Sequence, residues 1–291
     1  MITVDSTPEF FDPDASLRDI TPGRSLLSDA WRRYRRNKLA MFGLVLVCSL
    51  FLIAMIGPLL TDDPTKLYPF RNEPPTNQHF FGLDSLGRDQ LARVVHGIRL
   101  SLFIGFAAVA LETIIGVGIG AVAGWFGSWI DATLMRFVDI LLGIPYILLA
   151  FAIISVVGRG VGAVTATIGL TAWLSTSRNV RAGVIQAREQ DYVAAAKVVG
   201  VSNWRIVWRH VLPNVIQPII VLGTMGIGAA VLSEAAFSYL GVGIQEPTPS
   251  LGLMIDKAQG MFGSAPHLLI FPGLALIITV LGFLLVGDGL R

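Results

Sequence analysis

The sequence is poor in charged residues and has almost no cysteine. Asp, Glu, Lys and Arg together make up 14% of its 291 residues, whereas a soluble domain averages about 25%. The single thiol, Cys48, has no partner for a disulfide within the chain, and the four histidines show no zinc-ligand spacing. We therefore expect neither a disulfide-stabilised fold nor a metal site.

Motifs for nucleotide binding and for hydrolysis are also missing. The sequence has no Gly-x4-Gly-Lys-Ser/Thr phosphate loop, so we do not expect this chain to bind ATP. It has no Gly-x-Ser-x-Gly or His-Glu-x-x-His pattern that would pair a nucleophile or a metal with a base. Basic residues are not interleaved with stacking aromatics, which argues against nucleic-acid binding. We expect a chain without catalytic residues and without a cofactor of its own.

Long apolar blocks take the place of these features. Hydrophobic residues make up 53% of the chain, and its mean hydropathy is +0.67. About 20 consecutive apolar residues are enough for a helix to cross a bilayer. The sequence therefore predicts an all-α, multi-pass membrane protein with six transmembrane helices, at 39–60, 100–124, 132–157, 161–180, 215–240 and 268–287.

Basic residues are distributed unevenly around these spans. Five precede the first span, at 32, 33, 35, 36 and 38, and six more lie between residues 178 and 209 with only two acidic residues. The loop at 61–99 has five basic and five acidic residues. Because cytoplasmic loops carry the excess of Lys and Arg, we expect both termini and the loop at 181–214 in the cytoplasm. The loops at 61–99 and 241–267 are then outside.

The expected domain layout follows from this topology. Residues 1–38 are polar and lack the early apolar core of a signal peptide, so they are expected to form a cytoplasmic tail, with a possible surface helix at 26–38. Residues 39–291 are expected to form one membrane domain of six helices.

The loop between the fourth and fifth spans has a distinctive spacing. Three alanines at 194–196 are followed by three residues, Gly200, nine residues, His210, one residue, and Leu212-Pro213. Residues 187–199 favour a helix with Tyr192, Ala195, Ala196 and Val199 on one face. The small alanines would let another surface approach the helix closely. Gly200 lies where a left-handed helix cap is expected.

A second short helix is expected at 203–211, leading to Pro213. Trp204 and Trp208, together with Arg205 and Arg209, suit a position at the membrane interface. An ordinary amphipathic connector between spans is the alternative interpretation, although a connector would not need this spacing.

The spacing resembles the signature loop of the membrane subunits of binding-protein-dependent ABC importers, Glu-Ala-Ala-x3-Gly-x9-Ile-x-Leu-Pro. Two positions differ, since Ala194 stands where Glu is usual and His210 where Ile is usual. The resemblance implies that the loop docks on a separate ATPase subunit, with Ala195 and Ala196 facing that partner. The residues that it assigns to the loop are Asp191, Tyr192, Ala194, Ala195, Ala196, Lys197, Gly200, Arg205, His210, Leu212 and Pro213.

The first outer loop resembles the segment before the second span of oligopeptide and dipeptide permeases, Gly-Thr-Asp-x-x-Gly-Arg-Asp. Here it reads Gly82-Leu-Asp84-Ser-Leu-Gly87-Arg88-Asp89, with Leu83 in place of Thr. The acidic residues and Arg88 can form a charge network around two glycine turns. We favour a structural clamp over substrate contact. Segments at 124–145 and 234–273 are similar to the same family and indicate its second, C-type permease subunit.

Three ionisable residues fall inside predicted spans: Glu112, Asp139 and Glu234. Such groups are costly at membrane depth and usually face protein or water. We expect Asp139 to pair with Arg136, three residues before it. For Glu234, lining of a pathway and a packing hydrogen bond are both open. In addition, glycines at 116, 120 and 124 form a small-residue face suited to close helix packing.

The resemblance implies a type I ABC importer permease fold in a bacterial plasma membrane. It implies a homologous permease partner, two ATPase subunits that hold ATP and Mg²⁺, and an extracytoplasmic substrate-binding protein. Transport would be by alternating access, most simply of oligopeptides or dipeptides, although nickel or another solute is also open. A secondary transporter or channel is the main alternative, but the sequence has no internal repeat or paired mid-membrane charges. A membrane scaffold that transports nothing is a second alternative.

Overall fold

The computed structural model describes residues 31, 32 and 34–291, so residues 1–30 and 33 of the expected tail at 1–38 lie outside the described residues. The described chain is helical, and no strand forms in it beyond isolated bridges in the loop at 61–89. Its helices are α2 (Lys38–Leu60), α3 (Gln90–Phe126), α4 (Ser128–Leu142), α5 (Tyr146–Val157), α6 (Val161–Arg188), α7 (Asp191–Val198), α8 (Asn203–Ile206), the π-helical η1 (Val207–Val211), α9 (Leu212–Tyr239), α10 (Leu251–Ala258), the short η2 (Gln259–Met261) and α11 (His267–Gly289).

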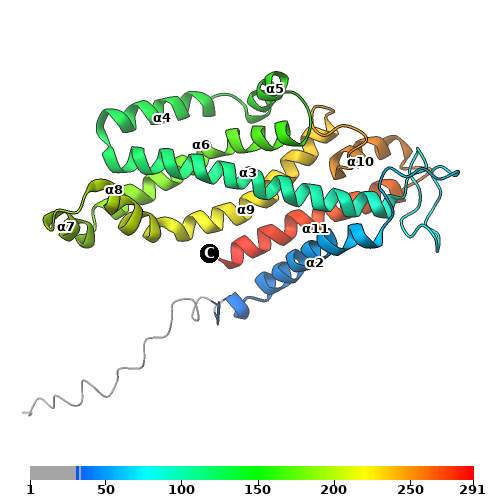
Figure 1. The fold of residues 1–291 in the computed structure, drawn as a ribbon, viewed down its shortest axis with the longest axis horizontal. Coiled ribbons are helices and arrows are strands. Elements are labelled where there is room, and N and C mark those ends of the chain that lie inside the picture. The colour runs from blue at the N-terminus through cyan, green and yellow to red at the C-terminus, as the bar shows by residue number, and fades with distance from the viewer. Residues whose placement is uncertain (1–30, 33) are drawn as a thin grey trace, which may run out of the picture.

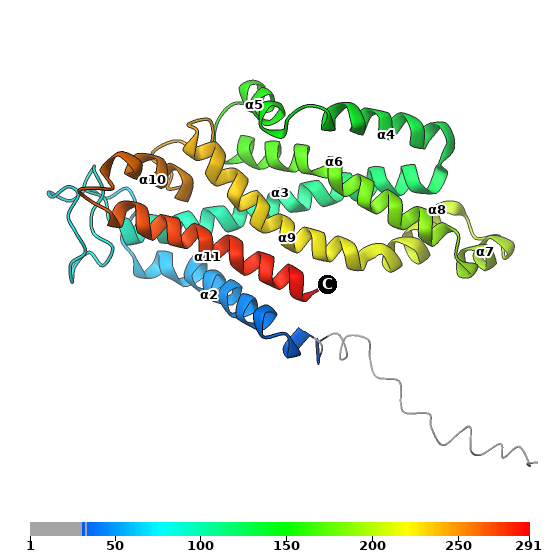
Figure 2. The same ribbon diagram turned by 180° about the vertical axis from the view of Figure 1, so that it is seen from behind.

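The long helices lie side by side in one bundle (Figures 1 and 2). α3 packs against α6 and α9, and α11 packs between α9 and α2. The bent pair α4 and α5 lies along the edge of the bundle next to α6, on the side away from α2. α7 and α8 lie at one end of the long helices, and α10 lies at the other end with the loop at 61–89.

Four helical segments are long and apolar enough to cross a membrane: α2, α3, the continuous run from Asn203 to Tyr239, and α11. The predicted spans at 39–60 and 268–287 correspond to α2 and α11 within one or two residues. The predicted span at 132–157 is wrong as a straight helix, because α4 and α5 meet at 93°. Gly143 ends α4 and Pro145 is the N-cap of α5, and a proline cannot continue the preceding helix.

Two helices are longer than their apolar blocks. α3 begins ten residues before the predicted span because Asp89 caps it, with Asp89 Oδ1 accepting from the Ala92 amide at 2.8 Å. α6 continues eight residues past its predicted end, to Arg188, through a polar stretch that the hydropathy pattern excluded. Four of the hydroxyl side chains of α6 face inward, since Thr167, Thr171, Thr176 and Ser177 are buried.

α3 and α6 are in backbone contact along a face of glycines. An added Cβ at Gly116 would lie 2.8 Å from Thr176 Cγ2, and one at Gly120 would lie 2.5 Å from the Ser177 carbonyl oxygen. At Gly124 the nearest atom would be the Arg181 carbonyl oxygen at 2.8 Å. The predicted small-residue face on the second span is therefore confirmed, and α6 is the helix that packs on it.

We expect Gly120→Ala to lower stability by about 1–3 kcal/mol, because the new methyl group would force the two helix backbones apart. Gly118→Ala is the matched control on the same helix, since a Cβ there would meet no atom within 4 Å. It should be neutral or slightly stabilising because alanine is the better helix former. The thermal unfolding of each detergent-solubilised variant measures the difference. Equal unfolding temperatures for the two variants would contradict the close contact.

Candidate functional site

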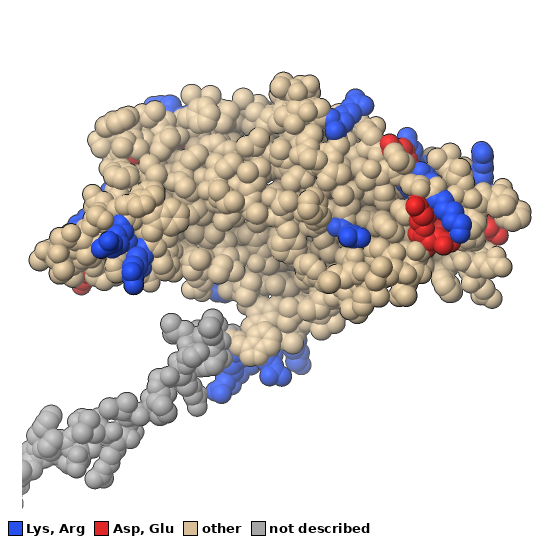
Figure 3. Space-filling view, in the orientation of Figure 1, with Lys and Arg blue, Asp and Glu red and all other residues tan. Residues whose placement is uncertain are grey.

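Charged side chains gather toward the two ends of the long helices, and the surface between those ends is largely uncharged (Figure 3). One end carries residues 189–213, which we call the docking loop. The other carries four ionisable residues, Asp84, Arg88, Arg93 and Glu246, which we call the outer cluster. The predicted site residues fall into these two groups and into a third, which lies inside the bundle.

The docking loop begins with a break in the helix. α6 ends at Arg188, Gln190 has an extended backbone, and α7 starts at Asp191. The expectation of one helix over 187–199 is therefore wrong at its start. Asp191 lies in the first turn of α7, where a carboxylate interacts favourably with the helix dipole.

Gly200 ends α7 in a Schellman motif. Its φ is +85°, in the left-handed region, so the predicted left-handed cap is confirmed. The Gly200 amide donates to the Lys197 carbonyl at 3.0 Å, and the Val201 amide donates to the Ala196 carbonyl at 3.1 Å. These two bonds satisfy carbonyls that a helix end would otherwise leave free.

The two faces of α7 differ in what they contact. Val193 is fully buried, and Ala196 and Val201 pack with it against a hydrophobic cluster formed by the ends of α3, α6 and α9. Ala196 lies half-buried against its own chain, and its expected contact with a partner stays a prediction. Ala195 is exposed, and so are Val198 and Val199, with 88% and 80% of their surfaces accessible. The exposed surface at the end of α7 thus includes a small apolar patch, although Asp191 and Lys197 are exposed as well.

The tip of α3 holds the docking loop in place. Trp125 is buried in the cluster that Val193 joins. Its carbonyl accepts a hydrogen bond of 3.1 Å from Arg188 Nη1, at the end of α6. Its ring lies beneath Lys197 Nζ, 5.1 Å from the ring centroid. One residue of α3 therefore contacts both the end of α6 and the last turn of α7.

The second helix of the loop runs directly into a long helix. α8, η1 and α9 form one continuous run from Asn203 to Tyr239, so the expected separate helix at 203–211 has no break after it. η1 is π-helical, with the Leu212 amide bonded to the Val207 carbonyl, and it contains His210. Leu212 is buried, and Pro213 is the second residue of α9. Arg205 is exposed.

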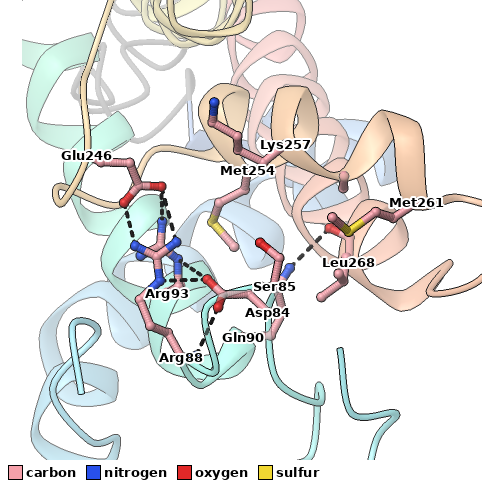
Figure 4. Close-up of a pocket in the computed structure, with 11 residues that line it drawn as sticks. Asp84, Ser85, Arg88, Gln90, Arg93, Glu246, Met254, Lys257, Met261 and Leu268 are labelled. Carbon is pink, nitrogen blue, oxygen red and sulfur yellow. Dashed lines mark hydrogen bonds and ion pairs between the residues drawn. The ribbon is translucent and has the colours of Figure 1, made fainter. Parts of the chain in front are cut away.

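The outer cluster joins the loop before α3 and the start of α3 to the loop between α9 and α10 (Figure 4). Arg88 Nε contacts Asp84 Oδ2 at 2.7 Å, and Arg88 Nη2 contacts Glu246 Oε1 at 3.1 Å. Arg93 Nη2 reaches the same Glu246 oxygen at 3.3 Å, and Arg93 is almost completely buried. Burial alone would lower the pKa of Arg88, but the Glu246 and Asp84 carboxylates outweigh it and raise this pKa above its usual value.

Local geometry explains the sequence around this cluster. Gly87 has φ +83°, and a Cβ there would lie 2.5 Å from the Tyr68 carbonyl oxygen, so the turn requires glycine. The predicted pairing of Asp84 with Arg88 is confirmed. Asp89 does not join it, because it caps α3 and contacts His79 Nδ1 at 2.8 Å. The arrangement has the geometry of a clamp between loops.

Glu234 lies at the centre of a third site, inside the bundle. It is fully buried, and its carboxylate accepts hydrogen bonds from three hydroxyl groups: Ser250 Oγ at 2.7 Å, Ser238 Oγ at 2.9 Å and Ser101 Oγ at 3.1 Å. We call these four residues the serine hub. Ser101 is on α3, Ser238 is on α9 with Glu234, and Ser250 is the N-cap of α10. Of the two open interpretations, this geometry favours the packing hydrogen bond.

The other two ionisable residues of the predicted spans, Asp139 and Glu112, both contact α6. Asp139 on α4 forms an ion pair with Arg178 of α6, so the expected pairing with Arg136 is wrong. The helix-to-helix pair became possible because α4 folds back along α6. Glu112 is half-buried and accepts a hydrogen bond from Thr176 Oγ1 on α6.

Sequence reasoning missed the residues that pair over long separations. Glu246 is 158 residues from Arg88, and Asp131 on α4 pairs with Arg181 of α6 fifty residues away. No local spacing links such residues. For Arg93 the sequence did indicate that a partner was needed. An arginine early in an otherwise apolar helix requires an acidic residue or water nearby. Among the described residues no group of His, Cys, Asp and Glu could hold a metal ion.

Comparison with known proteins shows which family the chain resembles. Residues 116–291 match a family described as the binding-protein-dependent transport system inner membrane component. Residues 25–75 match the N-terminal TM domain of oligopeptide transport permease C.

Similar proteins span nearly the whole chain. The dipeptide transport system permease protein DppC of Alkalihalophilus pseudofirmus is 40% identical over 281 residues, covering 96% of this chain and 91% of that protein. The oligopeptide transport system permease protein OppC of Bacillus subtilis is 37% identical, covering 92% and 88%. The glutathione transport system permease protein GsiD of Pectobacterium atrosepticum is 36% identical, covering 96% and 91%.

The serine hub gives a prediction for Glu234. Glu234→Gln should be mild, because the amide oxygen can still accept from the hydroxyl groups. Glu234→Leu should cost several kcal/mol, since each buried hydroxyl left without an acceptor costs about 1–3 kcal/mol. Thermal unfolding and yield of the purified chain measure this difference.

The same two changes at Glu112 are the matched control, since that half-buried carboxylate has one hydrogen-bond donor among the described residues. Their effects should be smaller and closer to each other. If Glu234→Leu were as stable as Glu234→Gln, the serine hub would not hold these helices together.

Proposed function

The chain belongs to the family of binding-protein-dependent transport system inner membrane components, and we propose that it is the C-type permease subunit of an ATP-driven importer of short peptides. It is a multi-pass membrane protein and a permease of the dipeptide and oligopeptide transport type. The observation that carries the mechanistic part of the proposal is the docking loop, whose small apolar face lies exposed at one end of the bundle.

In the proposed complex, all of the chemistry is carried out by other subunits. ATP and Mg²⁺ would be held by two ATPase subunits, and this chain would hold no cofactor. A homologous permease would complete the pathway, and an extracytoplasmic binding protein would deliver the peptide. The names of the similar proteins, which include dipeptide, oligopeptide and glutathione permeases, support a peptide cargo.

The proposed topology has six spans with both termini in the cytoplasm. They are α2, α3, the bent pair α4–α5, α6, α9 and α11. At about 1.5 Å per residue, the 28 residues of α6 are long enough to cross a bilayer, although its inward-facing polar residues lower its hydropathy. The proposed domains are the tail at 1–38 and the membrane domain at 39–291, with outer loops at 61–99 and 241–267 and a cytoplasmic loop at 181–214.

The position of α7 suggests how ATPase movement would reach the pathway. α7 lies between the end of α6 and the continuous α8–η1–α9 run. A force on its exposed face is therefore transmitted directly to two long helices, through Val193 and Ala196 and the cluster that they join. Closure of the ATPases would move these helices and switch the pathway from inward-open to outward-open. Glu112 is the candidate pathway residue, because its carboxylate is only partly covered by this chain.

A secondary transporter or channel is less well supported. Such proteins typically place paired charges and broken helices near the bilayer midplane. In the described residues, Glu234 interacts with serines rather than with a cation, and the buried ion pairs of Arg88 and Arg93 with Glu246 lie in the outer cluster at one end of the bundle.

Single cysteines test the topology. In a Cys48→Ala background, cysteines replacing Asn77 and Gln245 should react with an impermeant maleimide on intact cells. Cysteines replacing Gln190 and Val198 should react only after the membrane is opened, since all four positions are exposed on the chain itself. Labelling of 198 on intact cells would reverse the proposed orientation.

Bulky substitutions on α7 test the coupling. Ala195→Trp should leave the chain folded but hold the ATPase away from α7. We expect loss of ATPase co-purification and a fall in peptide uptake on the order of tenfold, the effect of about 1–3 kcal/mol of overpacking. Gly200→Val should do the same by straining the left-handed cap.

The matched control is Ala132→Trp, at an exposed alanine on α4 outside the docking loop. It should retain both ATPase binding and uptake. Normal uptake with the ATPase fully bound in both Ala195→Trp and Gly200→Val would reduce the docking loop to a simple connector.

A further inference from the structure

An apolar groove of about 330 Å³ opens on the surface beside the docking loop. α3 contributes Gly118 and Trp125, α4 contributes Leu134, and α8 and η1 contribute Trp204, Val207 and Trp208. We call it the tryptophan groove. Every residue that lines it is apolar or a tryptophan, so its side chains offer water no hydrogen-bond acceptor and no donor other than an indole N–H.

The groove is a built feature of the helix packing. Gly118 leaves its floor open, because a Cβ at this position would meet no atom within 4 Å. The Trp204 and Trp208 rings form one wall as an edge-to-face pair with centroids 5.6 Å apart. Both indoles are about half exposed, as expected for tryptophans at a membrane interface.

Unpaired positive charge lies next to this wall. Arg205 and Arg209 each follow one of the two tryptophans in the sequence, and both are exposed. Lys197 lies over the ring of Trp125, at the α3 side of the groove. None of these three residues forms an ion pair within the part of the chain that the structure describes. No carboxylate lines the groove.

We propose that the tryptophan groove binds one anionic phospholipid, with an acyl chain in the groove and the phosphate group on Arg205 and Arg209. The shape and the charge both fit this occupant. An α-helix is about 10 Å across, so the groove would hold less than one turn of a partner helix. Arginine pairs well with phosphate oxygens, and basic sites beside membrane helices attract anionic headgroups.

The site has a structural consequence for the docking loop. The acyl chain would fill the space between α8, α3 and α4, and so would brace α8 against the tip of α3. The proposal does not rest on the cargo or on the ATPase. Its test can therefore fail while the proposed function stands, and the reverse is also true.

Quenching of tryptophan fluorescence tests the site in the purified, assembled importer. The probes are phosphatidylglycerol and phosphatidylcholine, both with brominated acyl chains. The signal of a Trp204→Phe/Trp208→Phe variant is subtracted, so that the difference reports on the groove wall. We expect the fraction of phosphatidylglycerol that gives half-maximal quenching to be lower than that of phosphatidylcholine by a factor on the order of ten. The reason is that each of the two arginines near the headgroup contributes to binding of the anionic lipid.

Two variants separate the headgroup from the acyl chain. Arg205→Gln/Arg209→Gln should make the two lipids equivalent. Its matched control is Arg32→Gln/Arg36→Gln, a pair of exposed arginines with the same spacing before α2, which should keep the preference. Gly118→Phe should fill the groove and abolish most quenching by both lipids, whereas Gly118→Ala should not.

Four results would overturn the proposal. The first is equal quenching of the intact protein by the two lipids. The second is a preference for phosphatidylglycerol that survives in Arg205→Gln/Arg209→Gln. The third is quenching that is unchanged by Gly118→Phe. The fourth is the absence of quenching with either lipid, which would mean that a protein partner covers the groove.

Discussion

The close contact between α3 and α6 is the constraint on which most of this molecule depends. Three glycines, Gly116, Gly120 and Gly124, leave no side chain between the two helices, so the backbone of α3 lies directly on α6. In a bilayer the hydrophobic effect does not drive helices together, and van der Waals packing of this kind has to do so. The contact also explains why α6 can be polar, since its inward-facing Thr176 and Ser177 are covered by α3.

The position of the docking loop follows from that contact. Trp125 is the residue after Gly124, and Val184 packs on Gly124 from α6, so the two helix ends are fixed relative to each other. One side of α7, which includes Val193, therefore packs on these fixed helix ends. The other side exposes apolar residues such as Val198. A short helix of eight residues would be marginal alone. The tertiary contacts of α7 and its Schellman cap stabilise the helix.

The features that the sequence predicted well are those set by local rules. Apolar block length located α2 and α11, and the spacing of glycines predicted the face that packs on α6. The left-handed cap at Gly200 could be predicted because few other residues adopt that backbone. Within the docking loop, the helix break before Asp191 was missed because tertiary packing, rather than propensity, decides where α6 ends.

The errors come from contacts between distant parts of the chain. Periodicity placed Ala195 and Ala196 on one face, but which of them is covered depends on a cluster built from three other helices. Asp139 has a basic residue one turn away, yet it pairs with Arg178 because α4 folds back after Gly127. Glu246 could not be assigned to the outer cluster, since its partner Arg88 is on the other outer loop.

The two ends of the bundle also differ in how easily they can change. At the outer end, moving the loops apart would leave Arg93 buried without Glu246, which is costly for a nearly inaccessible guanidinium. The serine hub adds a second tie there, between α3, α9 and α10. At the docking loop the exposed side chains include Ala195, Val198 and Val199, and no described residue forms an ion pair with Arg205 or Arg209. In a cycle of alternating access, movement would therefore enter at the docking loop. The outer ends of α3 and α9 would turn together as one unit, because separating them breaks the buried polar contacts first.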